Sequence, residues 1–253
     1  MTRRRKLLSL YARIGRTYWS RRASLLLLAA VIFVPLGLLD ALAAEVNLDS
    51  LDLASGPKVA AVIAAVGAIT VTGLLGEVFY SGAVAVSLTH AEHEQAPPLA
   101  AIARRLNYRR LVAVDLVYVL IVAVGLLALV VPGILAFVWF GLSGPVVEIE
   151  DRTVLGALVR SWKLVRGNFW TVFFVLVPIE IAGDTIGEGI AGLVHGLLGH
   201  SLVAGWLAES VSNIFLTPVF AIAAVLLTLD LIAAKDGTGP RVGLQPSPTP
   251  SAA

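Results

Sequence analysis

Six long apolar segments divide this chain of 253 residues. They cover residues 24–44, 59–88, 111–131, 134–147, 169–181 and 214–234. Hydrophobic residues make up 58% of the chain and charged residues only 14%, whereas soluble domains average about 25% charged residues. An apolar segment crosses a bilayer as a helix, because a helix satisfies its own backbone hydrogen bonds. The sequence therefore predicts an all-α protein, a polytopic membrane bundle of about six transmembrane helices.

The basic residues are sorted between the ends of these segments. Eighteen of the nineteen lie in residues 1–22, 104–110, 152–166 or after 234, and only Lys58 lies elsewhere. Loops rich in Lys and Arg stay in the cytoplasm. This distribution predicts a multi-pass protein of the cell membrane with both termini in the cytoplasm.

The same boundaries predict three regions. Residues 1–22 form a basic cytoplasmic segment, residues 23–235 form the membrane domain, and residues 236–253 form a disordered tail rich in Pro and Ser. Residues 24–44 also resemble a signal peptide, because Arg21-Arg22 precede them and Ala41-Leu42-Ala43 end them. Their apolar core exceeds the usual length of about 7 to 15 residues, which favours a retained helix over a cleaved one.

The third and fourth segments leave two topologies open. Residues 134–147 give only about 21 Å of helix against a hydrocarbon core of about 30 Å. They either span a thinned bilayer or form, with residues 111–131, a hairpin that enters and leaves on one side. Pro132-Gly133 predicts a tight reversal between the two segments, and Pro145 predicts a second break.

Residues 152–166 predict a cytoplasmic amphipathic helix between the fourth and fifth spans, with Asp151 as its N-cap and Gly167 as its end. Its apolar face carries Leu155, Leu158, Val159, Trp162 and Val165. Four residues are expected to touch anionic lipid of the inner leaflet, namely Arg160, Trp162, Lys163 and Arg166. The alternative is a helix whose apolar side is covered by protein.

Acidic residues inside or beside the spans form a candidate polar site. They are Glu77, Glu180, Asp184, Glu188 and Glu209. An acid within a span faces protein or water rather than lipid. Glu180, Asp184 and Glu188 share one helical face, where like charges repel unless they are solvated, protonated or share a cation. The alternatives are a Glu77 carboxyl bonded to a neighbouring helix and outer-surface acids that point at water. Asp115 is expected to pair with Arg109 or Arg110.

Catalytic chemistry finds no support in the residue pattern. The chain has no cysteine, which excludes disulfides, thiolate metal sites and cysteine nucleophiles. His90 and His93 lack a third metal ligand at a defined distance, and no Ser, His and acid fall at a suggestive spacing. We therefore predict no catalytic residue, metal or cofactor, and no enzyme. The basic residues match no nucleic-acid-binding motif, so nucleic acid is not an expected partner.

Several motifs resemble one bacterial family. They are Pro132-Gly133-Ile134, Pro145-Val146-Val147-Glu148, the run ALVRSWKLVRG over residues 157–167 that contains Ser161, and Pro218 followed by Leu229-Asp230-Leu231. Together they resemble the six-span membrane domain of glycerophosphoryl diester phosphodiesterases, over most of the chain from the second segment onward. Thr228 and Ile232 depart from the tyrosine and arginine usual in that family.

This resemblance does not imply an enzyme. In fused members of the family the hydrolase is a separate soluble barrel, and its His-Arg-Gly and Glu-x-Asp elements are absent here. The prediction is a non-catalytic integral membrane protein that organises membrane lipid or a partner, which is another protein or a second copy of the chain. The alternative is a small transporter or exporter that uses the acidic polar site.

Overall fold

The computed structural model describes residues 3–45, 76–90 and 97–236, and within them every regular element is a helix. The elements are α1 (Arg3–Glu45), α3 (Glu77–Thr89), α4 (Leu99–Arg105), α5 (Tyr108–Ala128), α6 (Val130–Phe140), α7 (Ser143–Ile149), α8 (Val154–Val165), α9 (Phe169–Leu198) and α10 (Leu202–Asp236). The all-α prediction is confirmed for these residues.

Five helical stretches of the described residues are long and apolar enough to cross a membrane. They are Leu7–Leu38, Tyr108–Ala128, Val130–Ile149, Phe169–Leu198 and Leu202–Asp236. The predicted span 59–88 lies outside the described residues up to residue 75, and its end forms α3. The predicted disordered tail lies outside them from residue 237 onward. The chain therefore has the helices of a multi-pass membrane protein.

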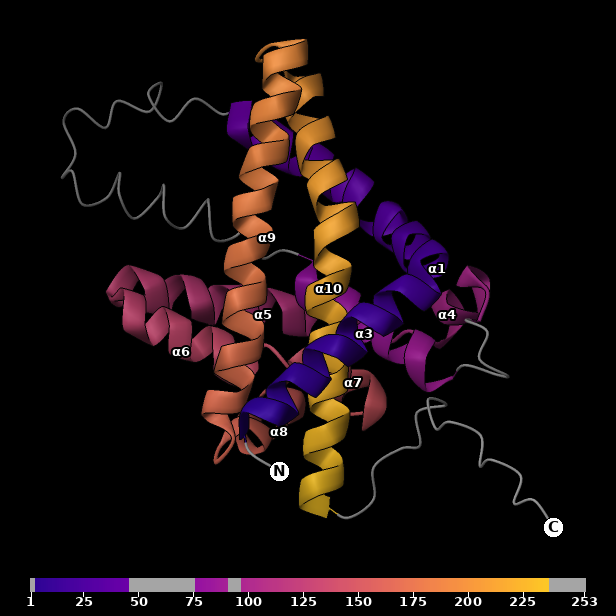
Figure 1. Ribbon diagram of the computed structural model, residues 1–253, viewed down its shortest axis with the longest axis vertical. Coiled ribbons are helices and arrows are strands. Elements are labelled where there is room, and N and C mark those ends of the chain that lie inside the picture. The colour runs from indigo at the N-terminus through magenta and orange to yellow at the C-terminus, as the bar shows by residue number, and fades with distance from the viewer. Residues whose placement is uncertain (1–2, 46–75, 91–96, 237–253) are drawn as a thin grey trace.

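Helix α10 lies at the centre of the bundle. Ten consecutive residues, 220–229, are buried, so the helix is covered on all sides there. It forms an antiparallel pair with α9, and α1 packs against it while crossing it obliquely (Figure 1). Helices α5 and α6 instead run across this pair as a hairpin (Figure 1).

Helix α1 continues without interruption through residue 22, where the sequence predicted a boundary between a surface segment and the membrane domain. Leu10, Ile14 and Thr17 are buried along one stripe of its basic part, because they recur at the helical spacing of three and four residues. Tyr11 donates a hydrogen bond to the Phe174 carbonyl at 2.7 Å. The basic part of α1 is therefore packed on the bundle.

The reversal between α5 and α6 lies at Leu129, the single residue between the two helices. The prediction of a reversal at Pro132-Gly133 is wrong by a few residues, because proline is tolerated in the first turn of a helix, where its missing N–H has no partner to lose. Pro145 likewise lies inside α7, and the second break falls before Ser143. A Cβ on Gly125 would lie 2.9 Å from the Gly133 Cα, so the two arms of the hairpin touch at glycines.

Candidate functional site

An aspartate from α5 determines where α3 begins. Asp115 is buried and accepts hydrogen bonds from the Gly76 N–H at 2.7 Å and the Val78 N–H at 3.1 Å. Gly76 has a φ of 91°, a conformation that glycine adopts without steric cost. A carboxylate suits this position, because the first amides of a helix are unpaired and carry partial positive charge. The expected pairing of Asp115 with Arg109 or Arg110 is wrong, since the α3 amides occupy its carboxylate.

Two of the predicted polar-site residues meet inside the bundle. Glu77, the first residue of α3, is 6% exposed, and its carboxyl group faces that of Glu180 on α9. The Glu77 Oε2 atom has no hydrogen-bond partner within the described part of the chain. These residues lie about a hundred positions apart in the sequence, and only the tertiary structure, in which α3 and α9 both pack against α10, brings them together.

The remaining predicted acids lie nearer the surface. Asp184 follows Glu180 by one helical turn and belongs to the electrostatic neighbours of Glu77. Glu188 follows by another turn and neighbours Asp184, and both side chains lie on the exposed part of α9. Glu209 is an exposed residue of α10 and is not among the groups that act on Glu77.

A tyrosine completes this group, in which Glu77, Asp115 and Tyr118 are buried and Glu180 is partly exposed. Tyr118 lies one turn after Asp115 on α5, is 0% exposed, and acts electrostatically with Glu77, Glu180 and Asp115. Among the described residues its hydroxyl has no hydrogen-bond partner. We call Glu77, Asp115, Tyr118 and Glu180 the interior acid cluster. Sequence reasoning did not include Asp115 and Tyr118 in the site, although an aspartate and a tyrosine three residues apart share one face of an apolar helix.

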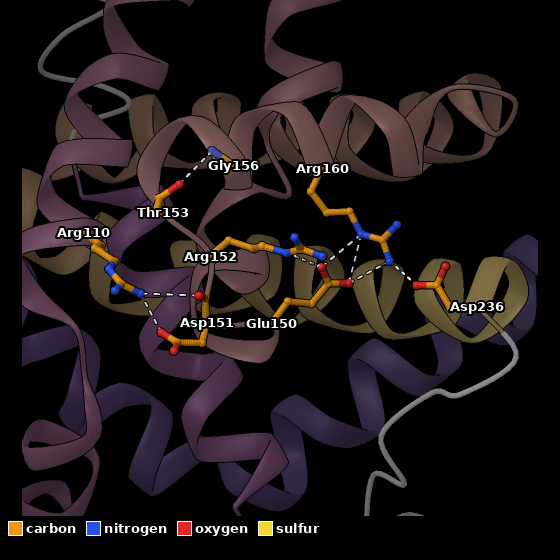
Figure 2. Close-up of polar contacts among 8 residues, drawn as sticks. All are labelled: Arg110, Glu150, Asp151, Arg152, Thr153, Gly156, Arg160 and Asp236. Carbon is orange, nitrogen blue, oxygen red and sulfur yellow. Dashed lines mark hydrogen bonds and ion pairs between the residues drawn. The ribbon is translucent and has the colours of Figure 1, made fainter.

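A second group of polar residues holds α8 in place. Figure 2 shows the Arg160 guanidinium between Glu150 and Asp236, the last residue of α10. Its Nε lies 3.0 Å and its Nη2 2.8 Å from Glu150 Oε1, and Nη2 also pairs with Asp236. The hydrogen bonds to Glu150 raise the pKa of Arg160. Arg160, predicted to touch lipid, is thus held by two carboxylates of the chain itself.

Side chains provide hydrogen-bond partners for backbone groups at both ends of α8. Thr153 is the N-cap, and its Oγ1 accepts a hydrogen bond from the Gly156 N–H at 3.3 Å (Figure 2). The prediction of Asp151 as N-cap is wrong, because its side chain pairs with Arg110 at 2.6 Å. At the other end, Lys235 donates to the carbonyl oxygens of Lys163 and Arg166, as a cation does at a helix C-terminus.

The predicted apolar face of α8 is divided between protein and surface. Leu158 and Val165 are buried, together with Ala157, Ser161 and Leu164. Leu155 is 72% exposed and Val159 is 50% exposed. Trp162 continues this second stripe, and the Arg166 guanidinium lies 5.1 Å from its ring centroid. We call Leu155, Val159, Trp162, Lys163 and Arg166 the outer face of α8.

Three residues of the motifs that resemble the bacterial family make contacts between helices. Glu148 accepts a hydrogen bond from the Asn107 N–H at 3.0 Å, at the start of α5. Ser161 donates to the Trp139 carbonyl at 2.7 Å, and Asp230 pairs with Arg13 at 2.8 Å. These residues therefore join α8 to α6, α7 to α5 and α10 to α1.

No group of three or more His, Asp or Glu residues within the described part of the chain is arranged to hold a metal ion. Comparison of the sequence with models of protein families, with curated proteins and with solved structures finds no match. The resemblance to the membrane domain of glycerophosphoryl diester phosphodiesterases therefore stays a prediction.

Proposed function

We propose that this chain is a non-catalytic integral membrane protein that organises anionic lipid at the inner surface of the cell membrane. The observation that carries the proposal is the outer face of α8, which presents aliphatic side chains, a tryptophan and two cations together. Such a combination suits the headgroup layer, where apolar groups enter the acyl boundary and cations meet phosphates.

The charges of this face are available to a ligand. Among the described residues, neither Lys163 nor Arg166 pairs with a carboxylate, whereas Arg160 pairs with two. The start of α9 follows directly, and its Trp170 and Phe174 are exposed. Aromatic side chains collect at the membrane interface because their rings tolerate both apolar and polar surroundings.

Helix α1 contributes to the same end of the bundle. Arg13 pairs with Asp230 near the end of α10, the helix whose last residue reaches Arg160. Further along α1, the exposed Trp19 stacks with the Arg22 guanidinium at 4.7 Å. Because the cations gather here, we assign this end to the cytoplasmic side, together with both chain ends.

Spin-labelled lipids test the proposal in the full-length protein reconstituted in bilayers of mixed phosphatidylglycerol and phosphatidylcholine. We expect contact with the wild-type protein to restrict the motion of a larger share of labelled phosphatidylglycerol than of labelled phosphatidylcholine. The Lys163→Gln, Arg166→Gln double variant should lose most of that preference, up to roughly fivefold per cation, because each contributes about 1 kcal/mol near the surface. High salt should have the same effect by screening.

Arg160→Gln is the matched control. It removes one cation from the same helix, but this cation is held by Glu150 and Asp236 and not by a lipid headgroup, so the lipid preference should fall much less than in the double variant. A wild type without preference, or a double variant equal to the wild type, would contradict the proposal and favour a partner protein on this face.

A second candidate function is a small carrier, favoured by the meeting of Glu77 with Glu180. Acids inside a membrane domain mark ion or proton paths. Proteoliposomes that contain a pH-sensitive dye should then acidify under an imposed potential, and Glu77→Gln should abolish the flux. Glu209→Gln, outside the interior acid cluster, should leave the flux unchanged. No flux in the wild type would reject the carrier.

A further inference from the structure

The interior acid cluster brings three acids together, and no cation among the described residues balances them. The groups that act on Glu77 are Glu180, Asp115 and Asp184, all of them acidic. Arg21 of α1 reaches α3 at the Ser87 carbonyl, about 15 Å along the helix from Glu77. The ionised forms of Glu77 and Glu180 would therefore repel each other in surroundings that screen charge poorly.

Hydrogen bonding separates the members of the cluster into two kinds. Asp115 is fully engaged, since its two oxygens accept the amides of Gly76 and Val78. In contrast, the Glu77 Oε2 and the Tyr118 hydroxyl are buried and have no partner within the described part of the chain. A buried polar atom without a partner is costly unless a ligand or a water satisfies it.

The ligand that fits these observations is a proton. Two facing carboxyl groups lose their repulsion when one proton bridges them, and a bridging proton needs no coordination sphere. The described residues offer no metal-binding group of three ligands. We propose that Glu77 and Glu180 form a proton-binding site inside the membrane domain, with the Tyr118 hydroxyl as an adjacent hydrogen-bonding group.

Helix α9 provides a path by which the proton enters and leaves the site. Asp184 and Glu188 continue from Glu180 at four-residue spacing, so neighbouring Cβ atoms lie about 5–6 Å apart, and both belong to the exposed part of α9. On release, the O–H bond of the shared proton breaks, a new O–H bond forms on the Asp184 carboxylate, and water then takes the proton. This inference does not depend on lipid binding by α8.

Infrared spectroscopy of the full-length protein in nanodiscs tests the site, because a protonated carboxyl group has its own C=O stretching band. During a pH titration we expect one protonation step, equivalent to a single proton, that is separate from the step of the exposed acids. Glu77→Gln and Glu180→Gln should each remove this step. Glu209→Gln, an exposed acid of α10 outside the interior acid cluster, should keep it, and Tyr118→Phe should shift the frequency of the band.

Further outcomes decide between the remaining interpretations. A wild type whose carboxyl groups all titrate as exposed acids would overturn the proposal, and this measurement does not depend on how any variant folds. Loss of the band on adding sodium or potassium at constant pH would also overturn it, because the site would then bind a metal cation. A separate step in a protein without proton flux would support the site and reject the carrier.

Discussion

At the scale of single residues, Pro178 leaves one carbonyl oxygen of α9 without its helical donor. A proline has no N–H, so the carbonyl four residues before it, that of Phe174, loses its usual hydrogen bond. The hydroxyl of Tyr11 occupies this position at 2.7 Å. In an apolar environment an unpaired carbonyl is costly, so α1 compensates for a break in α9.

Tyr11→Phe should therefore destabilise the protein by about 1 kcal/mol, and the cost should nearly vanish in a Pro178→Ala background, where residue 178 can donate to Phe174. A double-mutant cycle of unfolding in mixed micelles measures this coupling. Tyr18→Phe is the control, because its hydroxyl donates to the Phe215 carbonyl of α10 instead. Equal costs of Tyr11→Phe in the two backgrounds would contradict the assignment.

At the scale of elements, α3 and α7 approach each other through a glycine. A Cβ on Gly144 would meet the Val78 carbonyl oxygen of α3 and would lie 2.6 Å from the Ser81 Oγ. Backbone atoms cannot move aside as a flexible side chain does. The start of α3, which carries Glu77, is therefore positioned by this contact as well as by Asp115.

Gly144→Ala should cost roughly 1–3 kcal/mol of stability, because it overfills a packed contact. Gly15→Ala is the matched control, since nothing lies within 4 Å of a Cβ there, and it should stabilise α1 by up to about 1 kcal/mol. Thermal unfolding of the purified variants in detergent measures both. Comparable effects of the two substitutions would show that the contact is not close.

The α5–α6 hairpin is the element whose topology the sequence left open, and both of its arms are long and apolar enough to cross a membrane. Residues 116–147 contain no charged residue, and Leu129 at the reversal is 70% exposed. The two arms are joined at their base, where Glu148 accepts from Asn107 and Arg110 pairs with Asp151. From the exposed apolar reversal between joined ends, we predict a hairpin that enters the bilayer and returns.

Labelling of introduced cysteines tests this topology without background labelling, since the chain has no native cysteine. Val130→Cys should react with a membrane-impermeant maleimide from neither side, and only after detergent is added. Arg166→Cys should react from the cytoplasmic side, and Ser201→Cys, in the α9–α10 turn, from the outer side. Reaction of Val130→Cys from outside would instead show that α5 and α6 each cross the membrane.

At the scale of the whole molecule, large apolar side chains cover much of the surface. Helix α5 alone exposes a stripe of Val112, Leu116, Leu120 and Val124. Soluble monomers rarely expose such contiguous patches. Such a surface is compatible with a helix that faces the hydrocarbon of a bilayer.

The protein should accordingly stay in the membrane pellet after washes with alkaline carbonate or high salt, and detergent should release it. Western blotting of the two fractions measures this. The Lys163→Gln, Arg166→Gln variant serves as the control, because it should remain in the pellet although its lipid preference changes. Release of the wild type by carbonate would contradict membrane insertion.

The sequence by itself determined the helical class and the apolar segments, because a backbone in hydrocarbon must satisfy its own hydrogen bonds. It also identified Glu77 and Glu180 separately, since an acid within an apolar helix must face something other than lipid. Only the tertiary structure decided that they face each other, that Asp115 accepts the amides at the start of α3, and that Arg160 pairs with Asp236. Periodicity specifies which face of a helix a residue occupies, but not which distant helix packs against that face.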